Sequence, residues 1–239
     1  MRGIILAAGK GRRLEEVLKG KPKCLLKLGE KSLLQRQVEA MQKAGITEVV
    51  VVVGFEKQQV IDAAAKLPRK FHFVENPIYE KTNTLYSLWL ARRFFDEDFI
   101  YFNGDILCDF RTVRELVTRP MVSQLACVRH ACGDEEVKVL VRDGRITSIS
   151  KQIDPAACFG EFTGVARFCA RDNLRFSAIL DDCAKDESLW GRYFEHAVDI
   201  LAAETNLACA DITGLPVTEI DFPQDLINAE AEVLPRLMD

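Results

Sequence analysis

Small residues and cations meet directly after the apolar run that opens the chain. Residues 6–9 read Leu-Ala-Ala-Gly, and three cations lie within residues 10–13. Small residues let backbone amides approach an anion closely, while lysine and arginine neutralise its charge. We therefore expect a loop that holds a phosphate-bearing ligand. Its contacts would be Leu6, Ala7, Ala8, Gly9, Lys10, Gly11 and Arg13.

The loop differs from two common phosphate-binding motifs. It does not match G-x-x-x-x-G-K-[ST], and it lacks the third glycine of the dinucleotide fingerprint. The spacing argues against a P-loop and against an ordinary dehydrogenase. A solvated basic loop stays open as the alternative, because glycine-rich turns between strand and helix are common in α/β proteins.

Two aspartates each follow an apolar segment with the pattern of a buried strand. Asp105 ends Phe-Asn-Gly-Asp at 102–105, and Asp221 ends Glu-Ile-Asp at 219–221. Two carboxylates brought together repel unless a cation lies between them, and Mg²⁺ suits both carboxylate and triphosphate oxygens. We expect Asp105 and Asp221 to bind Mg²⁺. Taken singly, Asp221 could instead cap a helix that begins near Pro223.

Apolar runs and amphipathic stretches alternate through the first half, which is typical of βαβ units. The pattern predicts strands at 3–8, 48–53, 71–74 and 99–103, and helices at 32–44, 57–66 and 84–95. Open α/β sheets bind ligands at the carboxyl ends of their strands, which is where both the basic loop and Asp105 stand. The predicted fold is a Rossmann-like three-layer α/β fold with a mixed, mostly parallel sheet and a small acceptor-binding insertion.

Beyond about residue 120 the pattern changes to that of antiparallel strands. Runs at 136–141 and 145–149 are joined by Asp143-Gly144, a good hairpin turn. Further predictions are helices at 173–183 and 193–203, strands at 207–211 and 217–220, and a closing helix after Pro223. We expect one domain over 1–239, with a nucleotide-binding half at about 1–119 and an acceptor-binding and metal-completing half at about 120–239.

Composition excludes several classes of protein. The formal net charge is -4 and the cations are scattered, so nucleic acid is a poor partner. The opening apolar run stops at Gly9, and no segment reaches the roughly 20 apolar residues of a membrane span. The eight cysteines form no C-x-x-C pair, and we expect them to be buried thiols rather than zinc ligands. We expect a cytoplasmic protein without membrane insertion.

The segment Pro22-Lys23-Cys24-Leu25-Leu26, read with the basic loop, resembles the signature of the sugar-phosphate nucleotidyltransferase superfamily. The resemblance implies that the small residues of the loop meet the nucleoside and that Lys10 and Arg13 neutralise the leaving pyrophosphate. It also implies that Lys23 bridges the reacting phosphates, although a lysine in a proline turn can simply be solvated. Catalysis would then rest on Lys23, Arg13, Asp105 and Asp221.

Residues 76–91 resemble a segment of the bacterial choline-phosphate and aminoethylphosphonate cytidylyltransferases within that superfamily. Asn83, Thr84 and Ser87 offer neutral donors and acceptors that suit the edge of a pyrimidine. Simple helix capping would explain the same residue types. With Gly104, these three complete the expected nucleotide contacts.

The acceptor side rests on a second part of the resemblance. Residues 190–195, Trp-Gly-Arg-Tyr-Phe-Glu, stand where choline-phosphate enzymes carry an aromatic and acidic helix around a quaternary ammonium. Aromatic residues at helical spacing are also common in cores. Gly164 and Glu161 fall where the wider family approaches the acceptor. The expected acceptor contacts are Lys23, Tyr86, Lys151, Glu161, Trp190, Tyr193 and Glu195, while His72, His130 and His196 look structural or superficial.

The leading hypothesis is transfer of CMP from CTP to phosphocholine, with Mg²⁺ as cofactor and pyrophosphate as the second product. Aminoethylphosphonate, inositol 1-phosphate or a sugar 1-phosphate are alternative acceptors. A regulatory module that binds a nucleotide without turnover is the alternative of another class, although such a binder has no need of two metal carboxylates. The sequence leaves open a homodimer and whether CTP is used exclusively.

Overall fold

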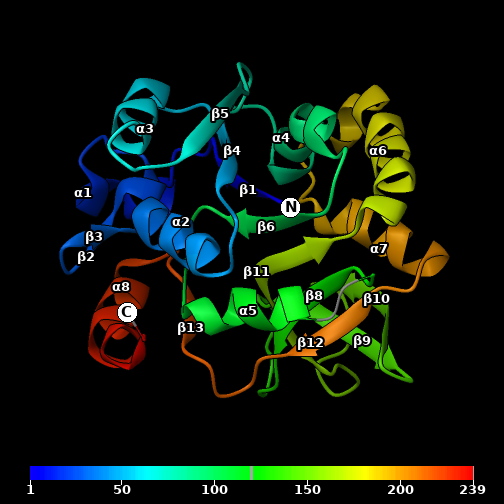
Figure 1. The fold of residues 1–239 in the computed structure, drawn as a ribbon. Coiled ribbons are helices and arrows are strands. Elements are labelled where there is room, and N and C mark those ends of the chain that lie inside the picture. Colours follow the sequence, from blue (N-terminus) through cyan, green and yellow to red (C-terminus); the bar gives the residue numbers. More distant parts are fainter. Residues whose placement is uncertain (119–120, 239) are drawn as a thin grey trace.

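The computed structural model describes residues 1–118 and 121–238, so the boundary expected near 119–120 lies outside the described residues. A nine-stranded mixed sheet runs through both halves of the chain, with strand order β5-β4-β1-β6-β11-β8-β12-β10-β9 (Figure 1). The predicted mixed α/β class is confirmed. In the described part of the chain, no helix is long and apolar enough to cross a membrane.

The first half contributes the parallel part of the sheet. Its strands are β1 (Arg2–Ala7), β4 (Glu48–Val53), β5 (Lys70–Glu75) and β6 (Phe99–Asn103). Residues 49–53 of β4 are all valine and at most 1% exposed. Such continuous apolar strands are typical of parallel sheets, because helices cover both faces. β4 and β6 have the predicted bounds.

The second half is mainly antiparallel. Its strands are β8 (Gln124–Val128), β9 (Lys138–Arg142), β10 (Arg145–Ser150), β11 (Gly160–Phe168) and β12 (Ala208–Asp211). β11 joins the halves by pairing antiparallel with both β6 and β8. The hairpin β9–β10 turns at Asp143 and Gly144, whose φ values of 50° and 75° are left-handed at both positions. That is the backbone that the predicted Asp-Gly turn requires.

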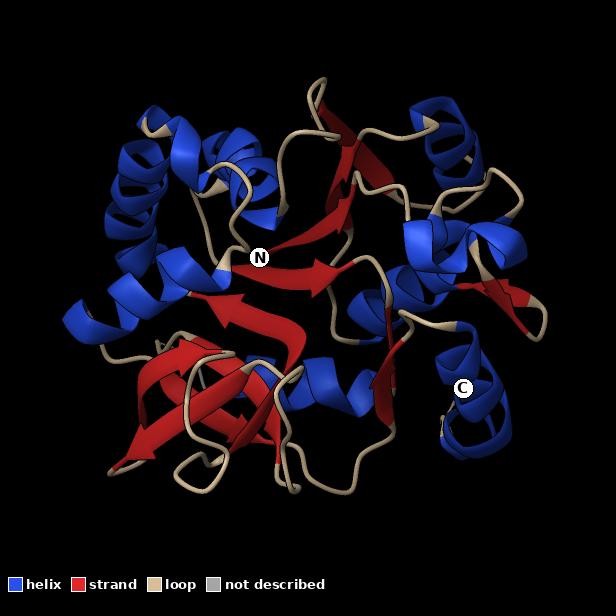
Figure 2. Ribbon diagram, turned by 180° about the vertical axis from the view of Figure 1, so that it is seen from behind, coloured by secondary structure: helices blue, strands red, loops and turns tan. Residues whose placement is uncertain are grey.

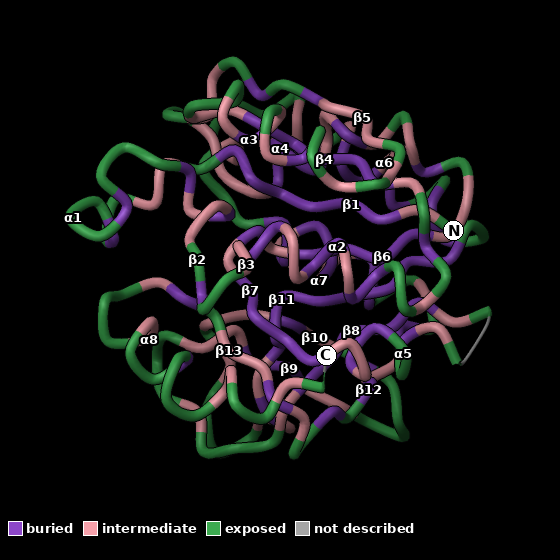
Figure 3. The backbone as a smooth tube through the Cα atoms, turned by 60° about the vertical axis from the view of Figure 1, so that its left-hand side comes forward, coloured by how far each residue is buried: buried purple, intermediate pink, exposed green. Residues whose placement is uncertain are grey.

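Helices cover the two faces of the sheet (Figure 2). α2 (Leu33–Lys43), α3 (Lys57–Ala64) and α5 (Phe110–Thr118) pack on one face, and α4 (Thr84–Ala91), α6 (Ala170–Lys185) and α7 (Glu195–Glu204) on the other. Neighbouring residues of β1 alternate between the two cores: Ile4 and Leu6 belong to one, Ile5 and Ala7 to the other. Figure 3 shows the buried strands between the more exposed helices.

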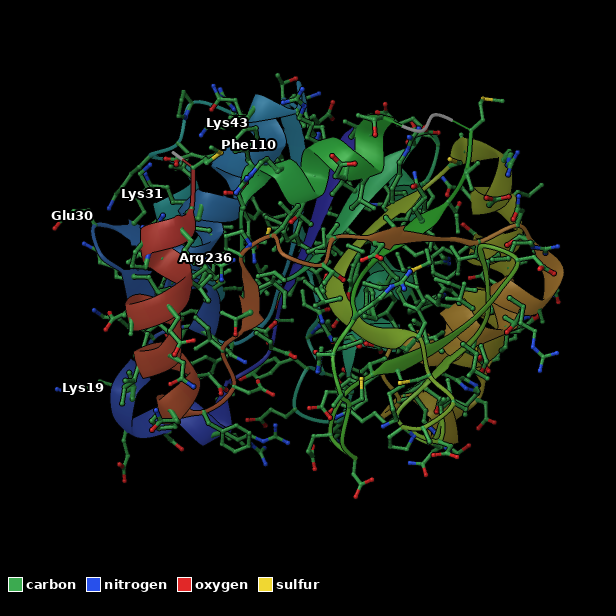
Figure 4. All side chains as sticks on the ribbon, turned by 90° about the horizontal axis from the view of Figure 1, so that it is seen from below. Lys19, Glu30, Lys31, Lys43, Phe110 and Arg236 are labelled. Atoms are coloured by element: carbon green, nitrogen blue, oxygen red, sulfur yellow. The ribbon has the colours of Figure 1, made fainter. Side chains whose placement is uncertain are left out.

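A third, smaller core joins the chain ends. Leu14 and Leu18 from the region of α1 (Glu15–Leu18) pack with Ile220 and Ala229, which flank α8 (Pro223–Asn228). Figure 4 shows the C-terminal helical segment beside the N-terminal region, and Lys43 of α2 near the ring of Phe110, 4.7 Å from its centroid. The remaining short strands are β2 (Lys27–Leu28), β3 (Lys31–Ser32), β7 (Ile106–Cys108) and β13 (Val217–Glu219).

Some predicted bounds differ from those observed. The helix expected over 84–95 ends at Ala91, and a 3₁₀ turn, Arg92–Phe94, follows it. The helix expected over 173–183 begins three residues earlier, at Ala170, because the chain enters it directly from β11. α5, β8 and β11 received no individual prediction.

An ion pair between a buried arginine and a partly exposed aspartate links β11 to the starts of β6 and α6. Arg167 is 2% exposed, and its guanidinium donates to Asp98 Oδ2 at 2.6 Å. The other carboxylate oxygen of Asp98 accepts from the backbone N–H of Ala170 at 2.7 Å. Burial raises the pKa of Asp98, but the Ala170 N–H and Arg167 together outweigh it, so the net pKa lies below the ordinary value.

Asp98→Asn should lower the free energy of unfolding by about 2 kcal/mol near neutral pH, because the substitution removes the carboxylate charge that faces the buried guanidinium of Arg167. A carboxylate with a lowered folded-state pKa stabilises the fold above its ordinary pKa of about 4 and loses that effect as the pH falls through the folded-state value. The variant should therefore lose less stability than the wild type below about pH 4. Urea unfolding over this range measures both effects. Asp62→Asn, at an exposed helical position, is the control, and equal acid slopes would contradict the assignment.

Candidate active site

The basic loop and Gly104-Asp105 lie at the same edge of the sheet. β1 and β6 are parallel neighbours, and Leu6 pairs with Asn103 at their carboxyl ends. A Cβ added at Gly104 would lie 2.5 Å from the carbonyl oxygen of Leu6, so the two segments approach too closely for any other residue. This contact fixes Asp105 beside the loop.

The loop itself turns at Gly11. Its φ of 65° is left-handed, and an added Cβ would lie 2.9 Å from Leu18 Cδ1 and 3.3 Å from Lys23 Cβ. Glycine is therefore required both for the backbone conformation and for the approach of Lys23. A 3₁₀ turn, Arg12–Leu14, follows and carries Arg13.

Short strands bring the second carboxylate segment to the first. β7 pairs antiparallel with β13, with Ile106 opposite Glu219. The Ile220 N–H donates to the Asp105 carbonyl at 3.2 Å. As a result, one carboxylate oxygen from each of Asp105, Glu219 and Asp221 lies within 4.8 Å of the others.

Lys23 lies between the two predicted metal ligands. Its Nζ donates to Asp105 Oδ2 at 2.8 Å and also to Asp221 Oδ1. Burial lowers the pKa of Lys23, but the two carboxylates more than reverse this effect and raise the net value, so the ammonium stays charged. Arg13 Nη1 donates to Asp221 Oδ2 at 2.9 Å. The side chain of Asp221 thus faces two cations, and the helix after it is capped by Asp225 instead.

The carboxylate cluster fits a hard divalent cation. Asp105 Oδ1 is buried and has no hydrogen-bond partner among the described residues. Desolvation of its carboxyl group within the cluster and the charges of Asp105 and Asp221 raise the pKa of Glu219 to about 8, although the residue as a whole is exposed. Carboxylates that lie this close repel one another, which costs free energy in the absence of a cation. Carboxylate oxygens are also the ligands that Mg²⁺ prefers. Glu219 was missed as a ligand, although its position two residues before Asp221 puts both on one side of an extended segment.

These groups face one cavity of about 440 Å³. Most of the predicted site residues line it: Leu6, Ala7, Gly9, Gly11, Arg13, Lys23, Asn83, Thr84, Gly104, Asp105, Lys151, Glu161, Tyr193, Glu195 and Asp221. Gly164 lines it too. Further lining residues that we did not single out include Arg12, Cys24, Asn103, Glu135, Val137, Phe162 and Glu219. Arg12, Cys24, Asn103 and Glu219 stood inside the segments quoted above, and Phe162 lies between Glu161 and Gly164, whereas Glu135 and Val137 gave no sequence signal for this site.

Three expected nucleotide contacts do not line the cavity. Ala8 is 5% exposed, and its carbonyl accepts from the Phe55 N–H at 3.0 Å. Lys10 Nζ lies 3.4 Å from a carboxylate oxygen of Glu15. Ser87 is buried and its hydroxyl accepts a hydrogen bond from the side chain of Asn76, so for this residue the structure supports a packing role.

Two expected acceptor contacts also lie outside the cavity lining. The rings of Tyr86 and Trp190 pack against each other, with centroids 5.1 Å apart. The indole N–H of Trp190 donates to the Ala184 carbonyl at 2.8 Å. The residues of segment 190–195 therefore differ in role. Trp190 packs against Tyr86 and Ala184, while Tyr193 and Glu195 line the cavity.

Asn83 and Thr84 were predicted either to contact the nucleotide or to cap a helix, and the structure is compatible with both roles. Asn83 is the N-cap of α4, and its backbone N–H donates to the Trp190 carbonyl at 2.8 Å. The Thr84 hydroxyl accepts from the Phe194 N–H at 2.9 Å. These bonds hold the 190–194 segment against the start of α4, and both side chains still line the cavity.

The remaining lining residues form an acidic region with one lysine. Glu161 lies 2.8 Å from Nε2 of His130, and burial raises the pKa of this carboxyl despite that partner. Lys151 Nζ lies 3.5 Å from Glu135 and 5.9 Å from the ring centroid of Tyr193. His130, expected to be structural or superficial, thus contacts a residue that lines the cavity.

Known proteins resemble this chain over most of its length. The chain is 31% identical to CMP-5'-(3-aminopropyl)phosphonate synthase of Streptomyces rubellomurinus over 98% of its own length, but it spans 39% of that longer relative. It is 25% identical to choline-phosphate cytidylyltransferase of Streptococcus pneumoniae, where the match covers 96% of this chain and 97% of the relative.

A solved structure has the same fold. The CTP:phosphocholine cytidylyltransferase of Streptococcus pneumoniae superposes with a TM-score of 0.79 at 23% identity, covering 96% of this chain and 97% of the other. The model of the MobA-like NTP transferase domain matches residues 3–167, which include the basic loop, Lys23 and Asp105. The chain therefore belongs to the MobA-like NTP transferase family.

Proposed function

We propose that the protein is a Mg²⁺-dependent cytidylyltransferase that transfers CMP from CTP to a small acceptor bearing a phosphate or phosphonate group. The observation that carries the proposal is the position of Lys23, between Asp105 and Asp221 and beside the basic loop. This arrangement sets a charged ammonium, whose side chain is 13% exposed, against a carboxylate cluster that lines the cavity. A protein that only bound a nucleotide would have no need of it.

The nucleotide side of the cavity would hold CTP. The loop glycines offer backbone amides close to the triphosphate, and Arg13 offers a guanidinium. Asn83 and Thr84 would contact the cytosine edge. Asp105 and Asp221, with Glu219, would hold the Mg²⁺, which when bound neutralises charge on the triphosphate oxygens. The proposed nucleotide contacts are Leu6, Ala7, Gly9, Gly11, Arg13, Asn83, Thr84 and Gly104.

The reaction needs positioning more than proton transfer. An oxygen of the acceptor's phosphate or phosphonate attacks the α-phosphorus, the bond to the bridging oxygen breaks, and pyrophosphate leaves with the electron pair. The nucleophile is already an anion, so no general base is required. Lys23 would bridge the reacting phosphates and Arg13 would stabilise the charge that develops on the leaving pyrophosphate.

The acceptor would lie against Lys151, Glu161, Tyr193 and Glu195. Phosphocholine, the first choice from the sequence, and aminoethylphosphonate both combine an anionic group with a cationic one, as the mixed charges of this lining require. Inositol 1-phosphate or a sugar 1-phosphate would bring no cation to the buried carboxyl group of Glu195. The names of the two relatives, an aminopropylphosphonate and a choline-phosphate enzyme, support the same class. We further propose a single cytoplasmic domain, with nucleotide and acceptor halves meeting at this cavity.

Pyrophosphate release should require CTP, Mg²⁺ and a zwitterionic acceptor together. UTP, GTP and ATP should support slower release, and a chelator should abolish it. A coupled pyrophosphate assay over four nucleotides and a panel of acceptors measures this. Asp105→Asn and Asp221→Asn should each lower kcat by more than roughly 100-fold, whereas Asp62→Asn should not change it. Full turnover in either site variant would contradict the metal assignment, and no release in any combination would leave only the regulatory alternative.

Lys23→Met should lower kcat by about 100- to 1000-fold, the usual effect of removing a preorganised charge from a transition state. The KM for CTP should change far less, because Arg13 and the loop amides still bind the triphosphate. Steady-state kinetics measures the separate effects on kcat and on the KM for CTP, and circular dichroism checks that the variant is folded. Lys57→Met, at an exposed pair with Glu75, is the matched control. A loss confined to KM would assign Lys23 to binding alone.

A further inference from the structure

Glu195 lines the cavity with an unsatisfied carboxylate. The residue stands at the start of α7 and is only 8% exposed. Its Oε2 is buried and has no hydrogen-bond partner among the described residues. Burial raises the pKa of this carboxyl to about 7, although its own backbone N–H and the charge of Lys151 act in the opposite direction.

A buried acceptor oxygen without a donor is costly, so it marks a place where a ligand supplies the donor. The protein's own cation in this region does not supply it. Lys151 lies over the ring of Tyr193 and within 3.5 Å of Glu135, and no hydrogen bond joins it to Glu195 among the contacts of the described residues. The missing partner is therefore a hydrogen-bond donor, preferably a cationic one.

The aromatic lining is poorly suited to a cation without donors. A quaternary ammonium is recognised by the faces of several rings around it. Among the described lining residues, Tyr193 and Phe162 supply the aromatic rings. The ammonium of Lys151 already lies over the Tyr193 ring, and Phe162 is 4% exposed and packs edge-on against Phe194. Trp190, which could have completed a cage, donates its indole N–H to Ala184 and does not line the cavity.

We infer that Glu195 selects acceptors with a primary ammonium group, aminoalkyl phosphates or phosphonates, over their quaternary counterparts. This inference rests on the proposed function and narrows its acceptor. A primary ammonium presents three N–H donors, one of which would bond Oε2 of Glu195, whereas a trimethylammonium presents none. The anionic end of the same acceptor would reach the α-phosphorus of CTP beside Lys23.

A methylation series tests the inference on the unaltered protein. Phosphoethanolamine, its N-methyl and N,N-dimethyl derivatives and phosphocholine carry the same positive charge and lose one N–H at each step. With CTP and Mg²⁺, kcat/KM should fall along the series and be at least about 100-fold lower for phosphocholine than for phosphoethanolamine, as expected where a polar group of the site loses its partner. A flat series, or one that rises toward phosphocholine, would overturn the inference.

Glu195→Gln tests the residue itself. Both end members lose an electrostatic attraction, but the primary amine also loses a charge-assisted hydrogen bond, so the ratio of their kcat/KM values should shrink about 10-fold. The KM for CTP should stay unchanged, which also shows that the variant folds. Glu187→Gln, exposed and outside the cavity lining, is the matched control and should keep the wild-type ratio. An unchanged ratio in Glu195→Gln would remove Glu195 as the selecting group.

Failure of the inference differs from failure of the proposed function. Release of pyrophosphate from CTP with phosphocholine or a sugar 1-phosphate, but not with the primary amine, would overturn the inference and leave CMP transfer standing. No release with any acceptor and any nucleotide would overturn the proposed function, and the inference with it.

Discussion

The site depends on one ammonium group held between two carboxylates. Lys23, in the N-terminal region, binds Asp105 and also Asp221, which is near the C-terminus. Lys23 and Asp221 are 198 positions apart in the chain, yet they belong to one charge cluster. Asp105 directly precedes β7 and Asp221 follows β13, so the pairing of these two short strands positions both carboxylates. The third core packs segments from the two ends of the chain against each other. Charges this close are stable only while all partners are in place. Under the proposed function, a triphosphate would bring negative charge to Lys23, and a divalent cation would bring positive charge to the two carboxylates.

Local patterns predicted the elements that position the site. β4 and β6 appeared at their observed bounds because continuous valine and aromatic runs leave little choice of structure. The Asp143-Gly144 turn followed from the need for left-handed backbone at two successive positions. The basic loop, Asp105 and Asp221 could be singled out because they stand at strand ends or beside glycines, where residue types indicate both backbone geometry and chemistry.

What the sequence could not predict depends on contacts between distant segments. The spacing of Glu219 and Asp221 places both on one side of an extended segment, but their approach to Asp105 depends on the pairing of β13 with β7, a register that no local pattern reveals. Trp190 and Tyr193 were both candidates for the acceptor side, with Tyr193 the better match. The Trp190 indole donates to Ala184 and lies outside the cavity lining, whereas Tyr193 lines the cavity. Ser87 was predicted to contact the nucleotide, but its buried hydroxyl accepts a hydrogen bond from the side chain of Asn76. In each case a tertiary partner decided the role of a residue whose type allowed several.

The most direct test of the account is a crystal structure with Mn²⁺ in place of Mg²⁺ and a non-hydrolysable CTP analogue. The account predicts an anomalous peak at about 2.1 Å from carboxylate oxygens of both Asp105 and Asp221, with the triphosphate on the loop at residues 9–13 and the Lys23 ammonium on a phosphate oxygen. A nucleotide bound at this loop with the metal away from both aspartates would contradict the account, as would a nucleotide bound outside this cavity.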